Sequence, residues 1–174
     1  MKMNYIRFNG SGFKGSGFKV KNRIIPPTLN CEPGTMNLEP GVFLMKIERF
    51  EDIEAWQLAR ELTRKVYCLG RKSRFAKDYG LKRQIQDAAG SSMHNIAEGF
   101  DSETNAEFTR FLRYAKRSCS EVQSELYVAL DEEYISADEF KDVYEQARRT
   151  RAAIRGFINY LKKYEDRKVP NCEP

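Results

Sequence analysis

Residues 91–100 read Ser-Ser-Met-His-Asn-Ile-Ala-Glu-Gly-Phe, and this stretch decides how the chain is expected to fold. It closes a segment, 79–98, in which apolar and small side chains return to one face at the spacing of an α-helix. Asp78 is the predicted N-cap of that helix, and Gly99 is its predicted end. Small residues in the middle of the segment predict that a neighbouring helix approaches closely there.

Three other segments show the same period. Residues 52–69 repeat apolar side chains at alternating spacings of four and three, with Asp52 as the predicted N-cap. Residues 105–131 keep this rhythm over three heptads, and a fourth segment opens with a capping box formed by Ser136 and Glu139. Four amphipathic helices joined by short loops predict an all-α fold, an antiparallel up-down-up-down four-helix bundle.

The bundle is expected to carry extensions at both ends. Residues 1–44 contain Gly-Ser-Gly-Phe-Lys twice in tandem and show no helical period, which predicts a weakly ordered N-terminal extension. The predicted helical domain covers 45–169, and 170–174 form a C-terminal tail. Asn-Cys-Glu-Pro occurs at 30–33 and again at 171–174, so we hypothesise that these flanks are translated from repeated DNA.

The composition fits a helical protein with well-solvated outer faces, since 41% of the residues are hydrophobic and 32% are charged. No apolar run approaches the roughly 20 residues of a membrane span, and the N-terminus lacks the apolar core of a secretory signal, so we expect a cytoplasmic protein. One histidine and four cysteines without C-x-x-C spacing predict no metal site, and we expect no cofactor. Cys68 and Cys119 are interpreted as small core residues.

The net charge of +5 is distributed unevenly. Residues 1–44 hold six Lys or Arg residues against two acidic ones, so most of the excess lies outside the predicted bundle. The first and fourth helices are acidic early and basic late, whereas the third is basic early and acidic late. Two interpretations are open: salt bridges between neighbouring helices, or complementary patches that drive self-association.

Basic side chains recur along the third and fourth helices, and antiparallel packing should bring the two rows together as one patch. Such a patch is typical of proteins that contact nucleic-acid phosphates, although a solvated charged face would give the same pattern. Tyr114 and Tyr127 could stack on bases or simply pack. The candidate nucleic-acid-binding residues are Arg110, Arg113, Lys116, Arg117, Arg148, Arg149, Arg151 and Arg155.

A second polar set is predicted between the second and third helices, where hydrogen bonds would fix their register. Because His94 is the only histidine, no Ser-His-Asp arrangement can be argued with any specificity, and we interpret His94 as structural or exposed. We therefore expect neither an enzyme nor a small-molecule substrate. The predicted structural polar set is Ser91, Asn95, Glu98, Ser118 and Glu121.

Residues 47–165 resemble the four helix bundle proteins of the 23S rRNA intervening-sequence family. The resemblance rests on three motifs whose combination is specific, although each motif alone is weak. The motifs are Phe-Glu-Asp-Ile-Glu-Ala-Trp at 50–56, Tyr-Gly-Leu-x-x-Gln-Ile at 79–85 leading into Ala-Ala at 88–89 and Asn-Ile-Ala-Glu-Gly at 95–99, and Phe-Leu-x-x-Ala-x-x-Ser-x-x-Glu at 111–121.

The resemblance implies a left-handed bundle that assembles as a homopentamer, with a link to intervening elements of bacterial rRNA genes. A related branch contains the accessory variability determinants of diversity-generating retroelements, which bind a reverse transcriptase and nucleic acid. The leading hypothesis is therefore a non-enzymatic homo-oligomer that binds RNA or a ribonucleoprotein partner through its basic faces. The alternative is a protein–protein scaffold in which charge sorting serves only self-assembly.

Overall fold

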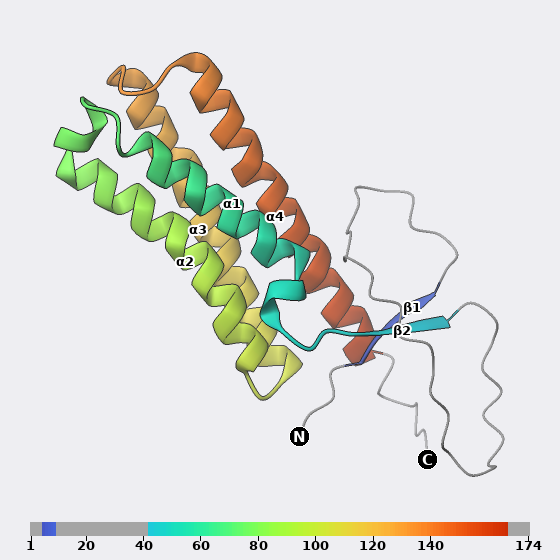
Figure 1. Cartoon of the computed structure of the whole chain (residues 1–174). Helices are drawn as coiled ribbons and strands as arrows, with labels where there is room; N and C mark the ends of the chain where they lie inside the picture. The colour runs from blue at the N-terminus through green and yellow to red at the C-terminus, as the bar shows by residue number, and fades with distance from the viewer. Residues whose placement is uncertain (1–4, 10–41, 167–174) are drawn as a thin grey trace, which may run out of the picture.

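The computed structural model describes residues 5–9 and 42–166 and contains four long helices in that part of the chain (Figure 1). Short 3-10 turns, η1 at Phe50–Asp52 and η2 at Phe75–Lys77, precede the first and second of them. The predicted all-α bundle is confirmed. The long helices are α1 (Glu54–Leu69), α2 (Tyr79–Asp101), α3 (Asn105–Asp131) and α4 (Ala137–Asp166).

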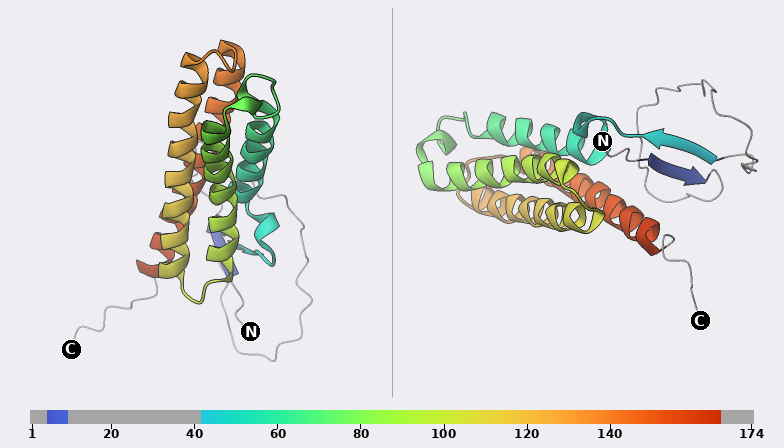
Figure 2. Two further views of the ribbon diagram at one scale, coloured as in Figure 1. Left: turned by 90° about the vertical axis from the view of Figure 1, so that its left-hand side faces the viewer. Right: turned by 90° about the horizontal axis from the view of Figure 1, so that it is seen from below.

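The four helices run alternately up and down, and each packs against its two neighbours around a common core (Figure 2). α2 packs on α1 and α3, and α4 closes the ring by packing on α3 and α1. Short loops join them, and residues 102–104 suffice to turn α2 into α3. This is the antiparallel arrangement that the loop lengths predict.

Two short strands precede the bundle and were not predicted. β1 (Tyr5–Asn9) pairs antiparallel with β2 (Val42–Lys46), with Tyr5 opposite Lys46. Strands so far apart in the sequence leave no hairpin-turn signal, which explains why the pattern missed them. The predicted start of the helical domain at Met45 falls inside β2. The tandem repeats and the tail 170–174 lie outside the described residues.

Two of the predicted helix starts are confirmed and one is wrong. Asp78 accepts a hydrogen bond from the Leu81 amide at 3.0 Å, as an N-cap should. The Ser136 amide donates to the Glu139 carboxylate at 2.9 Å and the Glu139 amide donates to Ser136 Oγ at 3.3 Å, which together form the predicted capping box. Asp52 does not cap α1, because it belongs to η1 and Ile53 occupies the N-cap position without a side-chain bond.

Gly99 does not end α2, which continues to Asp101. A Cβ atom built on Gly99 would lie 2.6 Å from Phe108 Cδ2 and 2.8 Å from Phe111 Cβ. Both distances are shorter than real side chains tolerate, so glycine is required here for the approach of α3 rather than for a turn. The glycine at position 99 does mark a structural constraint, but that constraint is the close packing of α3 and not the end of α2.

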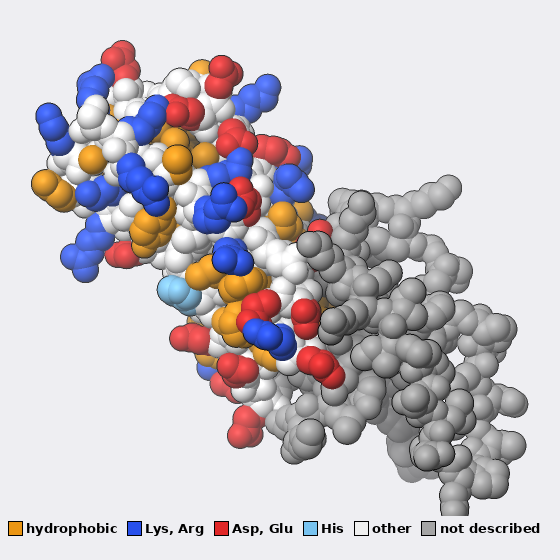
Figure 3. Space-filling view, in the orientation of Figure 1, with side chains coloured by type: hydrophobic (Ala, Val, Ile, Leu, Met, Phe, Trp, Pro, Cys, Tyr) orange, Lys and Arg blue, Asp and Glu red, His pale blue; other side chains and the backbone are white. Residues whose placement is uncertain are grey.

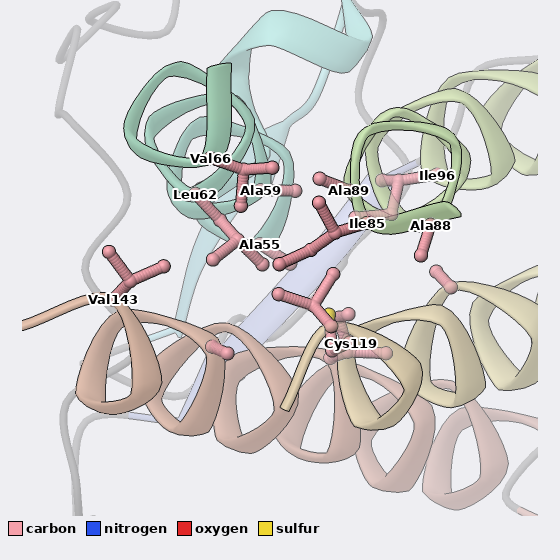
Figure 4. Close-up of a cluster of buried hydrophobic side chains, with 14 of the residues drawn as sticks. Ala55, Ala59, Leu62, Val66, Ile85, Ala88, Ala89, Ile96, Cys119 and Val143 are labelled. Atoms are coloured by element: carbon pink, nitrogen blue, oxygen red, sulfur yellow. The ribbon is translucent and has the colours of Figure 1, made fainter. Parts of the chain in front are cut away.

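The core is lined by the helix faces that the periodicity identified (Figure 4). Cys119 lies fully buried in it, and burial raises the pKa of its thiol to about 12. Cys68 is exposed, which corrects the prediction that it is a core residue. It lies two positions beyond the buried Val66, about 200° around α1, and therefore faces away from the core.

Within the described residues, no helix is both long enough and apolar enough to cross a membrane. No cluster of three or more His, Cys, Asp or Glu side chains suited to a metal ion occurs in that part of the chain either.

Candidate nucleic-acid interface

α3 and α4 meet along a line of polar and aromatic contacts. Arg151 Nη1 donates to Gln123 Oε1 at 2.7 Å. One turn away, the Tyr127 ring lies 4.9 Å from the ring centroid of Phe140 and 5.8 Å from that of Tyr144. These contacts fix which side of each helix faces the other, and so they also place the basic residues that share those sides.

Basic side chains flank this line on both helices. At 100° per residue, Arg113 and Lys116 fall within about 80° of Gln123 around α3, and Arg148 and Arg155 fall within about 60° of Arg151 around α4. We call this surface the α3–α4 strip. Its members are Arg113, Lys116, Gln123 and Tyr127 on α3 and Tyr144, Arg148, Arg151 and Arg155 on α4.

Most carboxylates of α3 and α4 lie away from the strip, and the exception on α3 is the exposed Asp131, one turn beyond Tyr127 and about 60° from Lys116. Around α3, Glu107, Glu121 and Glu125 lie about 140–180° from Lys116, toward α2 or solvent. Around α4, every carboxylate between 138 and 145 lies at least about 120° from Arg151. From Arg151 to Arg113, the α3–α4 strip therefore has a positive surface that the carboxylates of its own helices do not neutralise, whereas Arg148 pairs with Glu145 nearer the Tyr127 end.

The acidic residues at the start of α4 instead form ion pairs with lysines at and just after the end of α1. Lys65 Nζ lies 2.5 Å from Asp142 Oδ2, and Lys72 Nζ lies 2.6 Å from Glu139 Oε2. The hydrogen bond from Lys72 holds the pKa of Glu139 below its ordinary value. Of the two interpretations of charge sorting, salt bridges between neighbouring helices are thus present on this side of the bundle.

Arg151 is the best-anchored cation of the strip. Its side chain is half-buried, and besides the bond to Gln123 its Nε atom is buried without a hydrogen-bond partner. It makes no ion pair with any described carboxylate, whereas the exposed Arg148 pairs with Glu145 at 2.7 Å. A partly buried cation without a counter-ion is unfavourable, and a bound anion would reduce that cost.

The eight predicted nucleic-acid-binding residues do not form one patch. Arg113, Lys116, Arg148, Arg151 and Arg155 converge on the strip, and Arg117 lies at its margin with its guanidinium 5.8 Å from the Tyr114 ring centroid. Arg110 pairs with Glu107 at 3.3 Å and lies about 120° from Lys116. Arg149 lies about 160° from Arg151, on the side away from the strip.

The predicted polar set between α2 and α3 is smaller than expected. The Ser91 and Ser118 hydroxyls lie 3.0 Å apart, and Asn95 Nδ2 donates to the Ser91 carbonyl at 2.8 Å. Glu98 and Glu121 are exposed and lie outside this cluster, because their positions turn them toward solvent. The cluster links two helices and offers no arrangement for acid–base chemistry. His94 is exposed, one of its two predicted placements.

The sequence did not identify the aromatic cluster at one end of the strip. Tyr127 was expected either to stack on bases or to pack, and no partner for its ring was predicted. The structure joins Tyr127, Phe140 and Tyr144 into one cluster in which Tyr127 stays 50% exposed. Interaction with the Tyr144 hydroxyl raises the pKa of Tyr127.

The sequence profile of the 23S rRNA-intervening sequence protein family matches residues 51–156. The chain belongs to this family. The match spans the bundle from η1 into α4, so it includes every residue of the α3–α4 strip. A search of curated proteins finds no match.

A solved structure from the S23 ribosomal protein family shares the fold. It is a protein of unknown function from Bacteroides thetaiotaomicron VPI-5482, and it superposes with a TM-score of 0.56 at 19% sequence identity. The alignment covers 60% of this chain and 97% of that one. At this identity the likeness establishes the helical fold and says nothing further about activity.

Proposed function

We propose that this member of the intervening-sequence family is a non-enzymatic, cytoplasmic protein that self-associates and binds RNA through the α3–α4 strip. The observation that carries the proposal is Arg151, a half-buried cation held by Gln123 and left without a carboxylate partner in the described chain. RNA phosphates are the proposed anions, because the family is described by an intervening sequence of 23S rRNA. A ribonucleoprotein, such as one containing a reverse transcriptase, would present the same phosphates.

The electrostatics of the strip support a polyanionic ligand. Arg113, Lys116 and Arg155 add to Arg151 and form no ion pairs with described residues, so their charges are available to a ligand. Contacts of this kind release counter-ions, so affinity should fall linearly on a log–log plot against salt concentration, with a slope of about −0.7 per phosphate for a single strand. Such binding positions the RNA and carries little sequence preference by itself.

Self-association, with a homopentamer as the expected state, is the second part of the proposal. The family resemblance supports it, and so do the exposed apolar side chains that gather over α1 and α2 between blue and red groups (Figure 3). Tyr67 is 45% exposed on α1, and Trp56 and Met93 are only partly buried. A second protomer would cover apolar area of this kind.

The alternative is a protein–protein scaffold that uses its charges for assembly and binds no nucleic acid. The ion pairs between α1 and α4 weaken this alternative, because they occupy within one chain the complementary charges that it needs. The unpaired cations of the strip would then have no role. The two candidates therefore differ in a measurable way.

An electrophoretic mobility-shift series with structured RNA at rising salt tests the RNA half, and multi-angle light scattering tests assembly. Arg113→Glu with Arg155→Glu reverses two charges on the strip, and Arg110→Glu with Arg149→Glu reverses two charges off it. We expect only the first double variant to abolish the mobility shift. Both double variants should remain oligomeric. Failure of the wild type to bind at low salt would refute the RNA half, and a strict monomer would refute the assembly half.

A further inference from the structure

The α3–α4 strip ends in an aromatic surface that a phosphate site alone does not need. The rings of Phe140 and Tyr144 are stacked, with their centroids 5.2 Å apart and an interplanar angle of 25°. The Tyr127 ring contacts both of them. Tyr127 remains half-exposed although it makes two ring contacts. Its neighbours hold the ring in place, so a ligand that covered it would need little side-chain ordering.

The cations and the aromatic cluster follow one line along the bundle. Tyr127 is four residues from Gln123 and fourteen from Arg113, so the strip extends about 21 Å along α3 at 1.5 Å per residue. Tyr127, Gln123 and Lys116 lie within about 40° of one another around α3. On α4, Tyr144, Arg151 and Arg155 likewise lie within about 40°. A chain-like ligand can therefore contact ring and cations in succession.

We propose that the α3–α4 strip binds single-stranded RNA, with an unpaired base stacked on Tyr127 and the adjoining phosphates running past Arg151 toward Arg113 and Arg155. This inference rests on the proposed function and specifies the kind of RNA. Aromatic side chains that stack bases beside a cationic row are the recognised means of binding single strands.

Double-stranded RNA fits the strip less well. In a duplex the base faces are stacked inside, and proteins reach mainly the phosphates and 2′-hydroxyls. An exposed ring at the end of the strip would then contribute nothing to binding. Because stacking accepts any base, the strip should show little preference for sequence and a clear preference for unpaired RNA.

Fluorescence anisotropy with the full chain tests this inference. The probes are a labelled, unstructured oligoribonucleotide of about 12 nucleotides and a duplex of the same strand with its complement. Tyr127→Ala should weaken single-strand binding about tenfold, a loss of about 1.4 kcal/mol, and leave duplex binding unchanged. Tyr127→Phe should bind like the wild type, because the ring is retained. Circular dichroism of each variant checks that the helices still form.

Tyr114→Ala is the matched control, because Tyr114 is 41% exposed on the same helix but lies about 160° from Lys116. It should not change either affinity. Equal binding of duplex and single strand by the wild type, or equal losses from Tyr127→Ala and Tyr114→Ala, would overturn the inference while the RNA-binding proposal stood. Absence of binding to both probes at low salt would overturn both.

Discussion

Replacing Gly99 with alanine should destabilise the bundle, although alanine is the better helix former. Alanine in a helix interior is favoured over glycine by about 1 kcal/mol. Against this gain, the new methyl carbon would lie 2.6 Å from Phe108 Cδ2 and 2.8 Å from Phe111 Cβ. Phe111 Cβ is next to the backbone and cannot rotate away, so α2 and α3 must separate or both aromatic side chains must shift.

Overpacking of this kind costs about 1–3 kcal/mol. The contact at Gly99 involves two clashes below 3.0 Å, and Phe108 is itself held by Phe157 at a ring-centroid distance of 5.2 Å. We therefore place the cost near the upper end and expect Gly99→Ala to lower the free energy of unfolding by about 1–2 kcal/mol after the helix-propensity gain.

Gly156→Ala is the matched control. Gly156 lies in the interior of α4, is exposed, and has no atom within 4 Å of an added Cβ. Only the helix-propensity term remains there, so this variant should be more stable than the wild type by up to about 1 kcal/mol. The two substitutions are chemically identical and should have opposite signs.

Urea denaturation followed by circular dichroism measures both variants, and it should be repeated at several protein concentrations because self-association would add to apparent stability. If Gly99→Ala were as stable as the wild type, the conclusion that this glycine is required for close helix packing would be refuted. If Gly156→Ala lost as much stability as Gly99→Ala, the gain expected from helix propensity at Gly156 would be absent. Gly156→Ala would then not isolate the effect of helix propensity.

Three further outcomes follow from individual contacts. Ser136→Ala should lower the free energy of unfolding by about 1 kcal/mol in a denaturation series, because α4 loses its N-cap. At pH 8, iodoacetamide followed by peptide mass spectrometry should find Cys68 alkylated and Cys119 protected until the chain unfolds, because burial raises the pKa of the Cys119 thiol to about 12. The pKa of Glu139 in the folded chain lies below its ordinary value of 4.5, so its bond with Lys72 adds stability at pH values above 4.5. That stability is lost as the pH falls through the folded-state pKa. Lys72→Met should therefore flatten the acid limb of a plot of stability against pH.

The helices could be predicted from the sequence because the apolar period of each one coincides with its buried face. The α3 period, for example, places Leu112, Ala115, Cys119 and Val122 inward, and all four are fully buried. Local end signals were less reliable. The polar Asp52 looked like a cap, but burial of Ile53 positions the start of α1 instead.

The site was only partly predictable because charge type and spacing do not say which neighbour a side chain meets. Arg110 and Arg113 are three residues apart and equally basic, yet one pairs with Glu107 and the other faces the strip. The aromatic cluster depends on the register of α3 against α4, since Tyr127 and Tyr144 are seventeen positions apart in the chain. Only the folded arrangement brings such residues together.

The loops at one end of the bundle are fastened to each other, which has a mechanical consequence. Tyr134 stacks on Phe75 at 5.5 Å, its hydroxyl donates to Asp78 at 3.3 Å, and Arg74 lies 3.7 Å from Glu133. The start of α1 and the end of α4 lie together at the opposite end (Figure 1). A force applied to the chain at these two points therefore unzips α1 from α4 turn by turn instead of shearing the helices. A processive unfoldase that pulled on α4 from its C-terminal end would first have to draw Leu161, Ile158 and Phe157 out of the core, and it would reach the ion pairs with Lys65 and Lys72 and the fastened loops last.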